Sequence, residues 1–467
     1  MSEAVSSQST RAGMTAGERR SSLSLAFIFA LRMMGLFMIY PVFAVFARQL
    51  QGSTPALIGL ALGIYGLTQA LLQIPFGMIS DRIGRKPVIA GGLLLFALGS
   101  AVAALSNSIY GIILGRMLQG AGAVGSTILA LGADLTREEQ RTKAMAIIGL
   151  TIGMSFALAM VLGPILNTWI GLHGIFWLTA ALGLLGIAVL LWITPHPSQP
   201  RIHRDTEAVP ALFKRVLSDG QLLRLDFGIF ALHAILTATF VALPVALHNV
   251  AKFNLHQQWI LYLPVLAVSV IGMVPLIIIA EKHRRMKSIF LGAILAIAAA
   301  ELGLALWHAT LWAVVPALVL FFTAFNLMEA SLPSLISKVA PPTSKGTAMG
   351  VYSSSQFFGI FVGGTLAGWL QGHYGLAAVF AFAGCVGLVW FGIAVSMPQP
   401  SYLSSYLLRV GRLQNGKAGD LAEQLMAVRG VADAVVVGEE GVAYLKIDRK
   451  ELDEPALRKF SDFGTSP

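Results

Sequence analysis

Twelve apolar runs, each long enough to cross a lipid bilayer as a helix, constrain this chain more than any other feature of its sequence. About 20 residues suffice to cross the hydrocarbon, and an isolated span in lipid satisfies its backbone groups only as a helix. We therefore expect an all-α polytopic membrane protein over this part of the chain. The runs lie near 22–47, 55–79, 87–105, 108–131, 143–168, 173–193, 223–248, 257–281, 287–306, 311–337, 346–370 and 375–396.

The composition supports the same class of protein. Only 12% of the 467 residues are charged, against about 25% in ordinary globular proteins, which is too few to cover the surface of a soluble protein. The formal net charge is +10, but the basic residues fall beside the apolar runs, which indicates orientation in a membrane and no nucleic-acid partner. The single cysteine, Cys385, lies inside an apolar run, which excludes a disulfide framework and a thiolate metal site.

The distribution of lysine and arginine predicts the orientation of the spans. With the N-terminus inside, the inner segments before the C-terminal tail hold 20 Lys and Arg residues. The outer loops hold only Arg48 and Lys252. Since cytoplasmic loops carry the excess of basic residues, we expect both termini to be cytoplasmic.

The chain divides into a polar tail, two six-span halves and a separate C-terminal region. Residues 1–21 are rich in Ser, Thr and Arg and are expected to be disordered. The longest connection, 194–222, contains four prolines, Pro195, Pro197 and Pro200 among them, and separates an N-terminal half, 22–193, from a C-terminal half, 223–396. Such a duplicated layout is a known architecture of transporters, with the binding site between the halves near the midplane.

Residues 403–463 are expected to form a small cytoplasmic α+β domain with the order βαββα, because charge density rises and the apolar runs shorten. This order is close to the split βαβ, ferredoxin-like plan without its last strand. No C-x-x-C pair is present, so we predict no metal site in it. The expected elements are Tyr406–Val410, Ala418–Val428, Ala432–Val437, Val442–Ile447 and Leu452–Phe460.

One short motif stands between the second and third runs. It reads G-x-x-x-D-R-x-G-R-K, and a degenerate copy, Glu281–Arg285, follows the eighth run at the equivalent place. With membrane-length runs on both sides, the motif resembles the loop signature of the major facilitator superfamily. Its defined positions are Gly77, Asp81, Arg82, Gly84, Arg85 and Lys86.

The resemblance implies that this motif is a conformational latch between the two halves. Asp81 is expected to meet the positive N-terminus of run eleven, near Gly346, and Asp134 is the expected partner of Arg85. The alternative is that the loop only enforces topology through its positive charge.

Two further elements are similar to family motifs. Arg116 and Gln119 stand in an R-x-x-Q-G sequence, which implies a structural or proton-coupling role; the alternative is an arginine satisfied by backbone carbonyls. Gly163 and Pro164 begin a pattern like that of antiporters, but Leu166 and Asn167 stand where glycines are expected. The alternative there is a proline kink at a packing glycine.

Ionisable residues at membrane depth are few and are functional candidates by default. Glu329, one turn after Asn326 in run ten, is the first candidate for a carboxyl group that takes up and releases a proton. Arg32 in run one could bind an anionic group or pair with Glu329, and His233 in run seven could relay protons or simply be hydrogen bonded. Glu301 is expected to be a solvated residue near the outer end of run nine.

Polar side chains on several runs could line a cavity of mixed polarity. Gln69 and Gln73 are four residues apart and share a face of run two. Tyr40 and Gln356 add polar groups from runs one and eleven. Such a cavity suits an amphipathic or weakly polar solute.

Residues 22–396 resemble the drug/proton antiporter branch of the superfamily, and the C-terminal region is similar to that of its YajR-type group. Phe240–Pro244 and Glu329–Lys338 also resemble stretches of that group. The resemblance implies a proton-coupled efflux antiporter of the bacterial inner membrane that works by alternating access. We expect a monomer in the lipid bilayer that binds a small solute and protons and needs no cofactor or metal.

A membrane sensor that signals through residues 403–463 is the alternative function. An enzyme is not expected, because the sequence contains no H-E-x-x-H, G-x-S-x-G or phosphate-cradling G-K-[ST] motif.

Overall fold

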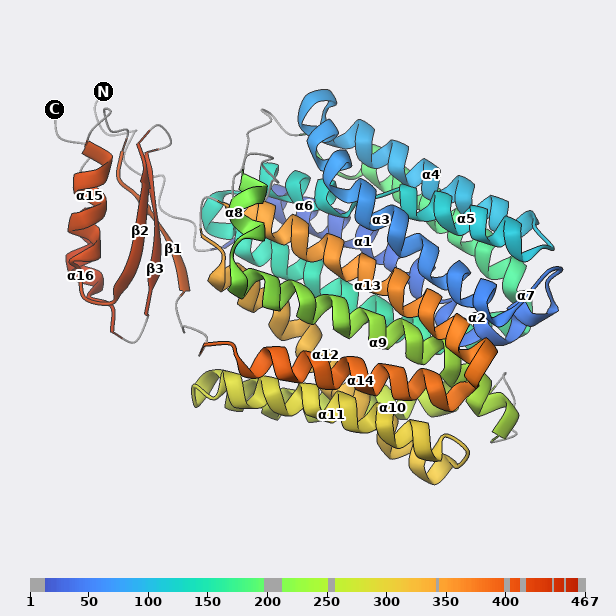
Figure 1. The fold of residues 1–467 in the computed structure, drawn as a ribbon. Helices are drawn as coiled ribbons and strands as arrows, with labels where there is room; N and C mark the ends of the chain where they lie inside the picture. The colour runs from blue at the N-terminus through green and yellow to red at the C-terminus, as the bar shows by residue number, and fades with distance from the viewer. Residues whose placement is uncertain are drawn as a thin grey trace.

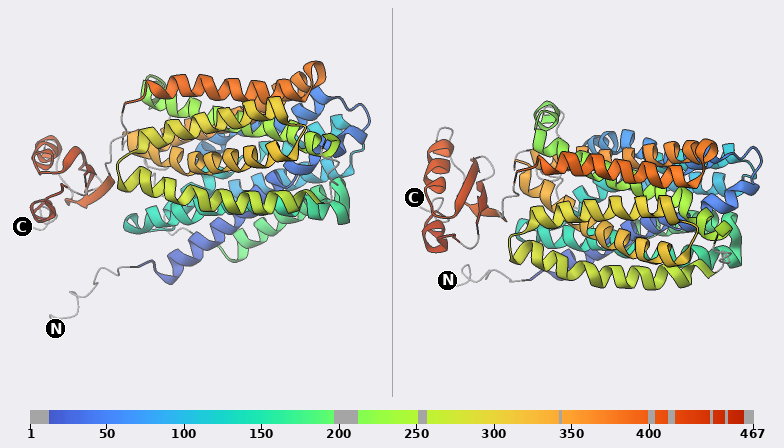
Figure 2. Two further views of the ribbon diagram at one scale, coloured as in Figure 1. Left: turned by 90° about the horizontal axis from the view of Figure 1, so that it is seen from below. Right: turned by 60° about the horizontal axis from the view of Figure 1, so that its bottom comes forward.

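The computed structural model describes residues 13–196, 212–250, 257–341, 344–398, 404–411, 417–438, 441–448 and 451–460. Long helices lie side by side in one bundle, and a small α+β region stands at one end of it (Figure 1). The views in Figure 2 show the same arrangement from two other directions. Most of the expected disordered tail, 1–21, and most of the expected linker, 194–222, fall outside the described residues.

The first half of the bundle consists of helices from the first six apolar runs. Run one forms α1 and α2, and run four forms α5 and α6, because short irregular turns interrupt both. α7 covers runs five and six, and the non-helical Gly171 (φ 66°, ψ −178°) divides it into two helices. The elements are α1 (Ala16–Phe37), α2 (Tyr40–Phe46), the 3₁₀ helix η1 (Ala47–Gln49), α3 (Pro55–Ile83), α4 (Arg85–Leu105), α5 (Ile109–Ala121), α6 (Gly125–Asp134) and α7 (Glu138–Trp192).

The second half begins with a short helix and continues with six long ones. They are α8 (Phe213–Leu217), α9 (Gly220–Val250), α10 (Gln258–Lys282), α11 (Met286–Trp307), α12 (Leu311–Val339), α13 (Lys345–Tyr374) and α14 (Leu376–Val395). Over the described ranges, 10 helical stretches are long and apolar enough to cross a membrane. The number is lower than the twelve runs because 143–192 counts as one stretch and because α13 is too rich in glycine and polar residues to be among them.

The two ends of the bundle differ in what they carry. We call the end with the turn at Gly84 and the α+β region the module end, and the end with the turns at Gly52, Gly171 and Gly375 the far end. Near the module end, Glu18 accepts hydrogen bonds from the backbone N–H and the side chain of Arg137, at 3.0 and 2.8 Å. This contact joins the first turn of α1 to the start of α7.

The two halves meet most closely where α3 crosses α13, toward the far end. A Cβ atom on Gly59 would lie 2.3 Å from the carbonyl oxygen of Gly364 and 2.6 Å from Cα of Gly368. One turn along α3, a Cβ on Gly63 would lie 2.7 Å from the carbonyl oxygen of Phe361. Only glycine allows this approach of two backbones, which lipid-embedded helices use to pack tightly.

The C-terminal region has the expected order of strand, helix, strand, strand, helix. β1 and β2 are both antiparallel to β3, which lies between them, so the sheet is a split βαβ arrangement with strand order β1-β3-β2. One side of the sheet packs on α15 through Leu421 and Leu425. The elements are β1 (Ser404–Arg409), α15 (Lys417–Met426), β2 (Val431–Val437), β3 (Val442–Ile447) and α16 (Glu454–Arg458).

Two contacts hold this region to the second half of the bundle. Arg284, in the turn between α10 and α11, donates hydrogen bonds to both carboxylate oxygens of Asp448 at 2.9 and 3.1 Å. Lys446 donates to the carbonyl oxygen of Val339, the last residue of α12, at 3.3 Å. Partial burial lowers the pKa of the Lys446 ammonium, although Asp433 and Asp219 act in the opposite direction.

Candidate functional site

The signature turn is built around a glycine and an arginine. Gly84 has a φ of 98°, a backbone conformation that side chains with a Cβ rarely adopt, and it lets α3 turn directly into α4. Arg85 then reaches back to donate hydrogen bonds to Ser80 at 2.7 Å and to Asp81. Its Nε lies 3.3 Å from a carboxylate oxygen of Asp134 at the end of α6. The structure therefore brings Asp81, Arg85 and Asp134 together.

The other signature residues have different surroundings. Lys86 is buried, and its ammonium donates a hydrogen bond to the carbonyl oxygen of Thr194 at the end of the first half. Arg82 is exposed. A Cβ on Gly77 would meet the Ser126 hydroxyl oxygen at 3.4 Å, so α3 and α6 are close there.

The predicted contact of Asp81 with the start of α13 is not formed in this structure. Within the described residues, the side chain of Asp81 pairs with Arg85 in its own half of the bundle. The physical reason is proximity, because residues four apart on one helical face are already neighbours.

Arg32 is the centre of a buried polar cluster in the first half. Its guanidinium donates to the hydroxyl of Tyr65 at 2.7 Å and to the amide oxygen of Gln69. The Gln69 amide in turn donates to Gln73 at 2.9 Å. Nε and Nη1 of Arg32 have no hydrogen-bond partner in the part of the chain that the structure describes, so the 1% exposed guanidinium keeps donors available.

The second buried arginine, Arg116, has more of its side-chain nitrogen atoms in hydrogen bonds than Arg32 has. Arg116 donates to the carbonyl oxygen of Ala61 at 3.3 Å and to Gln119 at 2.7 Å, and Gln119 donates to Ser100 at 2.7 Å. The Arg116 guanidinium carbon lies 4.8 Å from the centre of the Tyr65 ring, within range of a cation–π contact. These contacts join α3, α4 and α5, which favours the structural alternative for the R-x-x-Q-G element.

A second cluster, in the other half, contains His233, Glu329 and Gln356. Nδ1 of His233 lies 3.3 Å from the carbonyl oxygen of Ile229, an acceptor, so the neutral ring carries its proton there. Nε2 can then accept from the amide of Gln356 at 2.8 Å. Glu329 lies 3.7 Å from Nε2 of His233 and 3.5 Å from the Gln356 amide. A proton on Nε2 would therefore create an ion pair with Glu329.

One possibility for Arg32 is not realised, and the expectation for Glu301 is wrong. Arg32 and Glu329 do not pair, because each already has polar neighbours in its own half of the bundle. Glu301 is fully buried and is no solvated end residue, because α12 and α14 pack along α11 and Thr239 of α9 lies against its carboxyl group. Asn326 is half-buried and makes no side-chain hydrogen bond within the described residues, so it lies near Glu329 without being part of the cluster.

Aromatic rings fill the space between the two halves. The ring of Tyr40, which is fully buried, lies 5.8 Å from that of Phe240, and the ring of Phe156 lies 5.8 Å from that of Phe325. Phe325 also contacts the ring of His233 at 6.1 Å. The sequence did not single out Phe156 or Phe325, because an apolar ring in an apolar run gives no signal of the surface it faces.

The Gly163–Pro164 pair lies in a continuous part of α7. A Cβ on Gly163 would lie 2.4 Å from the carbonyl oxygen of Met38, so this glycine lets α7 pack against the chain between α1 and α2. The break in helical dihedral angles within α7 comes later, at Gly171. These contacts favour the packing alternative for the pair.

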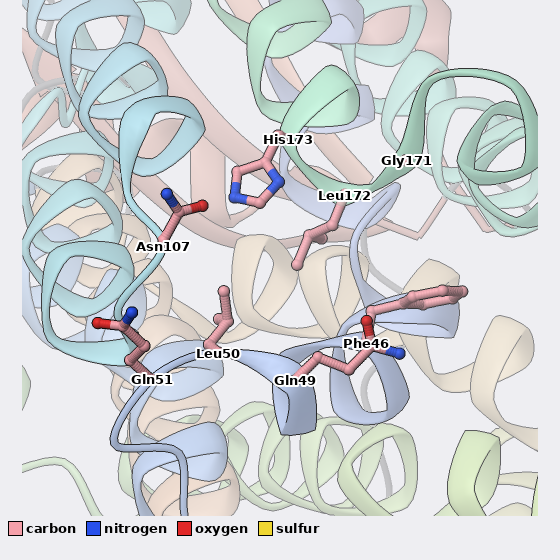
Figure 3. A pocket seen from close by; sticks show the side chains of 8 residues that line it. All are labelled: Phe46, Gln49, Leu50, Gln51, Asn107, Gly171, Leu172 and His173. Atoms are coloured by element: carbon pink, nitrogen blue, oxygen red, sulfur yellow. The ribbon is translucent and has the colours of Figure 1, made fainter.

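An open pocket lies away from both polar clusters. Its volume is about 390 Å³, and it is at the far end, between the η1 segment and the second part of α7. Figure 3 shows His173 and Leu172 on one side and Leu50 and Gln49 on the other. His173 is already within 3.0 Å of the Ser106 carbonyl oxygen. We do not assign the site there, because the buried ionisable groups lie elsewhere.

Comparisons of sequence agree with the motifs. A model of the Major Facilitator Superfamily matches residues 25–364. The chain is 49% identical over 453 residues to the inner membrane transport protein YajR of Escherichia coli (strain K12), an alignment that covers 96% of this chain and 99% of the relative. It is 27% identical over 361 residues, 76% of this chain and 87% of the relative, to the multidrug resistance protein MdtH of Aeromonas salmonicida (strain A449).

The fold is also similar to that of solved structures. One is a bacterial homolog of the human lysosomal transporter Spinster, crystallised in an inward-facing and occupied conformation. The two chains superpose with a TM-score of 0.64 over 82% of this chain and 96% of that one, at 16% sequence identity. At this identity the likeness shows a shared fold.

Proposed function

The chain belongs to the major facilitator superfamily, and from this premise we propose that it is a proton-coupled secondary transporter of small solutes in the bacterial inner membrane. Membership makes it a transporter and no enzyme. The finer proposal is a monomer that exports an amphipathic solute in exchange for protons. It is driven by the proton gradient and needs no cofactor.

One observation carries this proposal, namely that each half contains a cluster of polar side chains inside the bundle, around the buried Arg32 in one half and around the buried His233 in the other. Arg32 with Tyr65 belongs to one half, and His233 with Glu329 belongs to the other. The ring of Tyr65 lies 6.3 Å from that of Phe357 on α13, the helix that also carries Gln356 of the second cluster. Polar groups inside a membrane are costly and are retained for function.

The second cluster is suited to handle a proton. In its neutral form His233 accepts from Gln356, and Glu329 lies close enough to exchange a proton with the ring directly or through one water. Protonation of Glu329 or His233 changes the charge next to the solute region. Solute binding and proton binding at adjacent sites would then influence each other, as linkage requires.

Alternating access requires contacts that can close each end of the bundle in turn. The glycine contacts between α3 and α13, which we call the glycine crossing, lie toward the far end, and the signature turn lies at the module end. We propose twelve membrane crossings, with the module end cytoplasmic. The glycines of α3 and α13 close the far end in this structure, whereas Asp81 is paired inside its own half. In the opposite state, the halves would rock so that Asp81 meets the start of α13.

Export by antiport is supported by likeness to drug-resistance proteins. The name of the MdtH relative describes it as a multidrug resistance protein. The aromatic rings and the few polar groups between the halves would fit an amphipathic or weakly polar solute once the halves move apart. The missing glycine at Leu166 weakens the antiporter motif, so the direction of transport needs measurement.

The direct test uses purified protein in proteoliposomes with an imposed pH gradient. A panel of amphipathic and weakly polar solutes is screened for flux that follows the gradient and stops when an ionophore collapses it. Gradient-dependent movement of at least one solute supports the proposal. Movement of every accepted solute at the same rate with and without the gradient would contradict proton coupling.

Removing the negative charge of Asp81 in the signature turn should slow transport without preventing insertion of the protein into the membrane. We expect Asp81→Asn to reduce flux several-fold, because the latch then lacks the carboxylate that Arg85 and the start of α13 would share. Flux and the amount of protein in the membrane are measured together. Asp420→Asn, an exposed aspartate of α15, is the matched control. Wild-type flux in the Asp81→Asn carrier would leave the turn with only a topological role.

A sensor remains the second candidate function, because the C-terminal region contacts the bundle through Arg284 and Asp448. Truncation before residue 403 separates the two functions. A transporter should keep measurable flux, since the polar clusters lie entirely in the bundle. A sensor should still bind its ligand without showing flux at any stage. Solute flux and solute binding by the truncated chain, compared with the full chain, decide between them.

A further inference from the structure

A fully buried carboxyl group lies in the C-terminal half, outside the cluster of Glu329. Glu301 on α11 is 0% exposed, and its Oε1 lies 2.8 Å from the hydroxyl oxygen of Thr239 on α9. The same hydroxyl oxygen lies 2.7 Å from the carbonyl oxygen of Ile235, one turn earlier on α9. Both distances are those of hydrogen bonds between oxygen atoms.

Counting the hydrogens in these two contacts assigns the protonation state of Glu301. A threonine hydroxyl has one hydrogen, and a backbone carbonyl oxygen has none to donate. If the Thr239 hydroxyl donates to Ile235, the hydrogen between Thr239 and Glu301 must come from the carboxyl group. Only the acid form of Glu301 satisfies both contacts at once.

The surroundings also disfavour a carboxylate. The second oxygen, Oε2, has no hydrogen-bond partner within the described residues. Along α11, Ile297, Ala298 and Leu304 are buried on the same face as Glu301. Burying an ionised carboxylate with at most one hydrogen bond in an apolar interior costs a large free energy. A carboxyl group in such a place binds a proton and becomes neutral.

No nearby charge offers an ion pair instead. The other titratable groups of α11 and of the helices around it are Arg224, Asp226, His233 and His248 on α9, Tyr262, Glu281 and Lys282 on α10, Lys287 on α11, Glu329 and Lys338 on α12, and Cys385 on α14. Arg224, Asp226, Lys282, Lys287 and Lys338 lie in the module-end turns of their helices, whereas Glu301 lies in the far-end half of α11. His233 and Glu329 face each other and Gln356. Tyr262 packs toward Phe240, and Cys385 is exposed on the outer surface of the bundle. Within the described residues, the hydrogen-bond partner of Glu301 is Thr239.

We propose that Glu301 is a second proton-binding site, occupied in this structure, whose acid group donates its proton to Thr239. Its place in the fold gives the bound proton a role in the contact between the halves. Phe240, the residue after Thr239, lies against Tyr40 of the other half. The hydrogen bond from protonated Glu301 to Thr239 thus fixes the turn of α9 whose Phe240 contacts Tyr40 of the other half.

Infrared spectroscopy of the full-length protein in detergent or lipid tests the proposal directly. At neutral pH, we expect the carbonyl stretch of a protonated carboxylic acid that shifts in D₂O. It should be absent from Glu301→Gln and present in Glu329→Gln. Thr239→Val should shift the band, because the acid loses its acceptor. Thr237→Val, a threonine of α9 that is equally buried, should leave the band in place.

The opposite result is equally clear. If Glu301→Gln removes a carboxylate band and leaves the acid region unchanged, Glu301 is ionised and the proposal is wrong. Circular dichroism and size-exclusion chromatography show whether each variant is folded, and Glu301→Gln keeps the shape and an N–H donor for Thr239. The measurement needs no transport, so its failure would leave the proposed function untouched.

Discussion

Gradient-driven flux should fall to the uncoupled level when Glu329 is replaced by glutamine. The substitution keeps the size and polarity of the side chain but removes the group that can exchange a proton with His233. Coupling between two binding sites is typically worth about 1–3 kcal/mol, or roughly 5- to 150-fold. We therefore expect Glu329→Gln to lose at least about fivefold of the pH-driven flux in proteoliposomes.

The control distinguishes lost coupling from lost binding. Exchange of labelled solute across the membrane at equal pH should persist in Glu329→Gln, because the first cluster and the aromatic rings are unchanged. Glu423→Gln, on the exposed face of α15, makes the same chemical change outside the bundle and should transport normally. Undiminished gradient-driven flux in Glu329→Gln would assign the transported proton to another group.

A side chain at Gly59 should prevent the far end from closing. Even a Cβ atom there would lie 2.3 Å from the backbone of α13, so the clash cannot be relieved by turning a side chain. Overpacking of this kind costs about 1–3 kcal/mol, which favours states in which α3 and α13 stand apart. Gly59→Val should therefore reduce flux about tenfold, since 1.4 kcal/mol corresponds to a factor of ten.

Distances between spin labels check the physical cause of that loss. Labels at Gln51→Cys and His373→Cys, in a Cys385→Ser background, mark the far ends of α3 and α13. Their separation should increase in Gly59→Val. Gly149→Val is the matched control, because a Cβ at Gly149 meets no atom within 4 Å. Normal flux with an unchanged distance distribution in Gly59→Val would contradict the role of the glycine crossing.

Local features of the sequence were sufficient to predict the helices and the signature turn. Apolar runs of membrane length correspond to α1 through α7 and to α9 through α14, because a span in lipid has no alternative to the helix. Gly84 supplies the positive φ between α3 and α4, and Arg85 lies one turn from Asp81. These relations depend on residues that are close in the chain.

The charged site was predicted less completely, since partners within the membrane come from distant parts of the chain. Glu329 and His233 were identified as rare ionisable residues, but their mutual contact through Gln356 involves three helices. Arg32 could have paired with a carboxylate, whereas the fold places it on Tyr65 and Gln69. Charge and depth identify a candidate residue, but they do not identify its neighbour.

The sequence by itself determined that this chain is a bundle of membrane helices with a charged turn and a small α+β region, because hydrophobic length and turn chemistry are local properties. Only the tertiary structure decided that Glu301 is buried against Thr239 and that α3 meets α13 through glycines. Both depend on which face of each helix points inward. In a helix that is apolar all round, packing against neighbours decides that face, and the periodicity of the sequence does not.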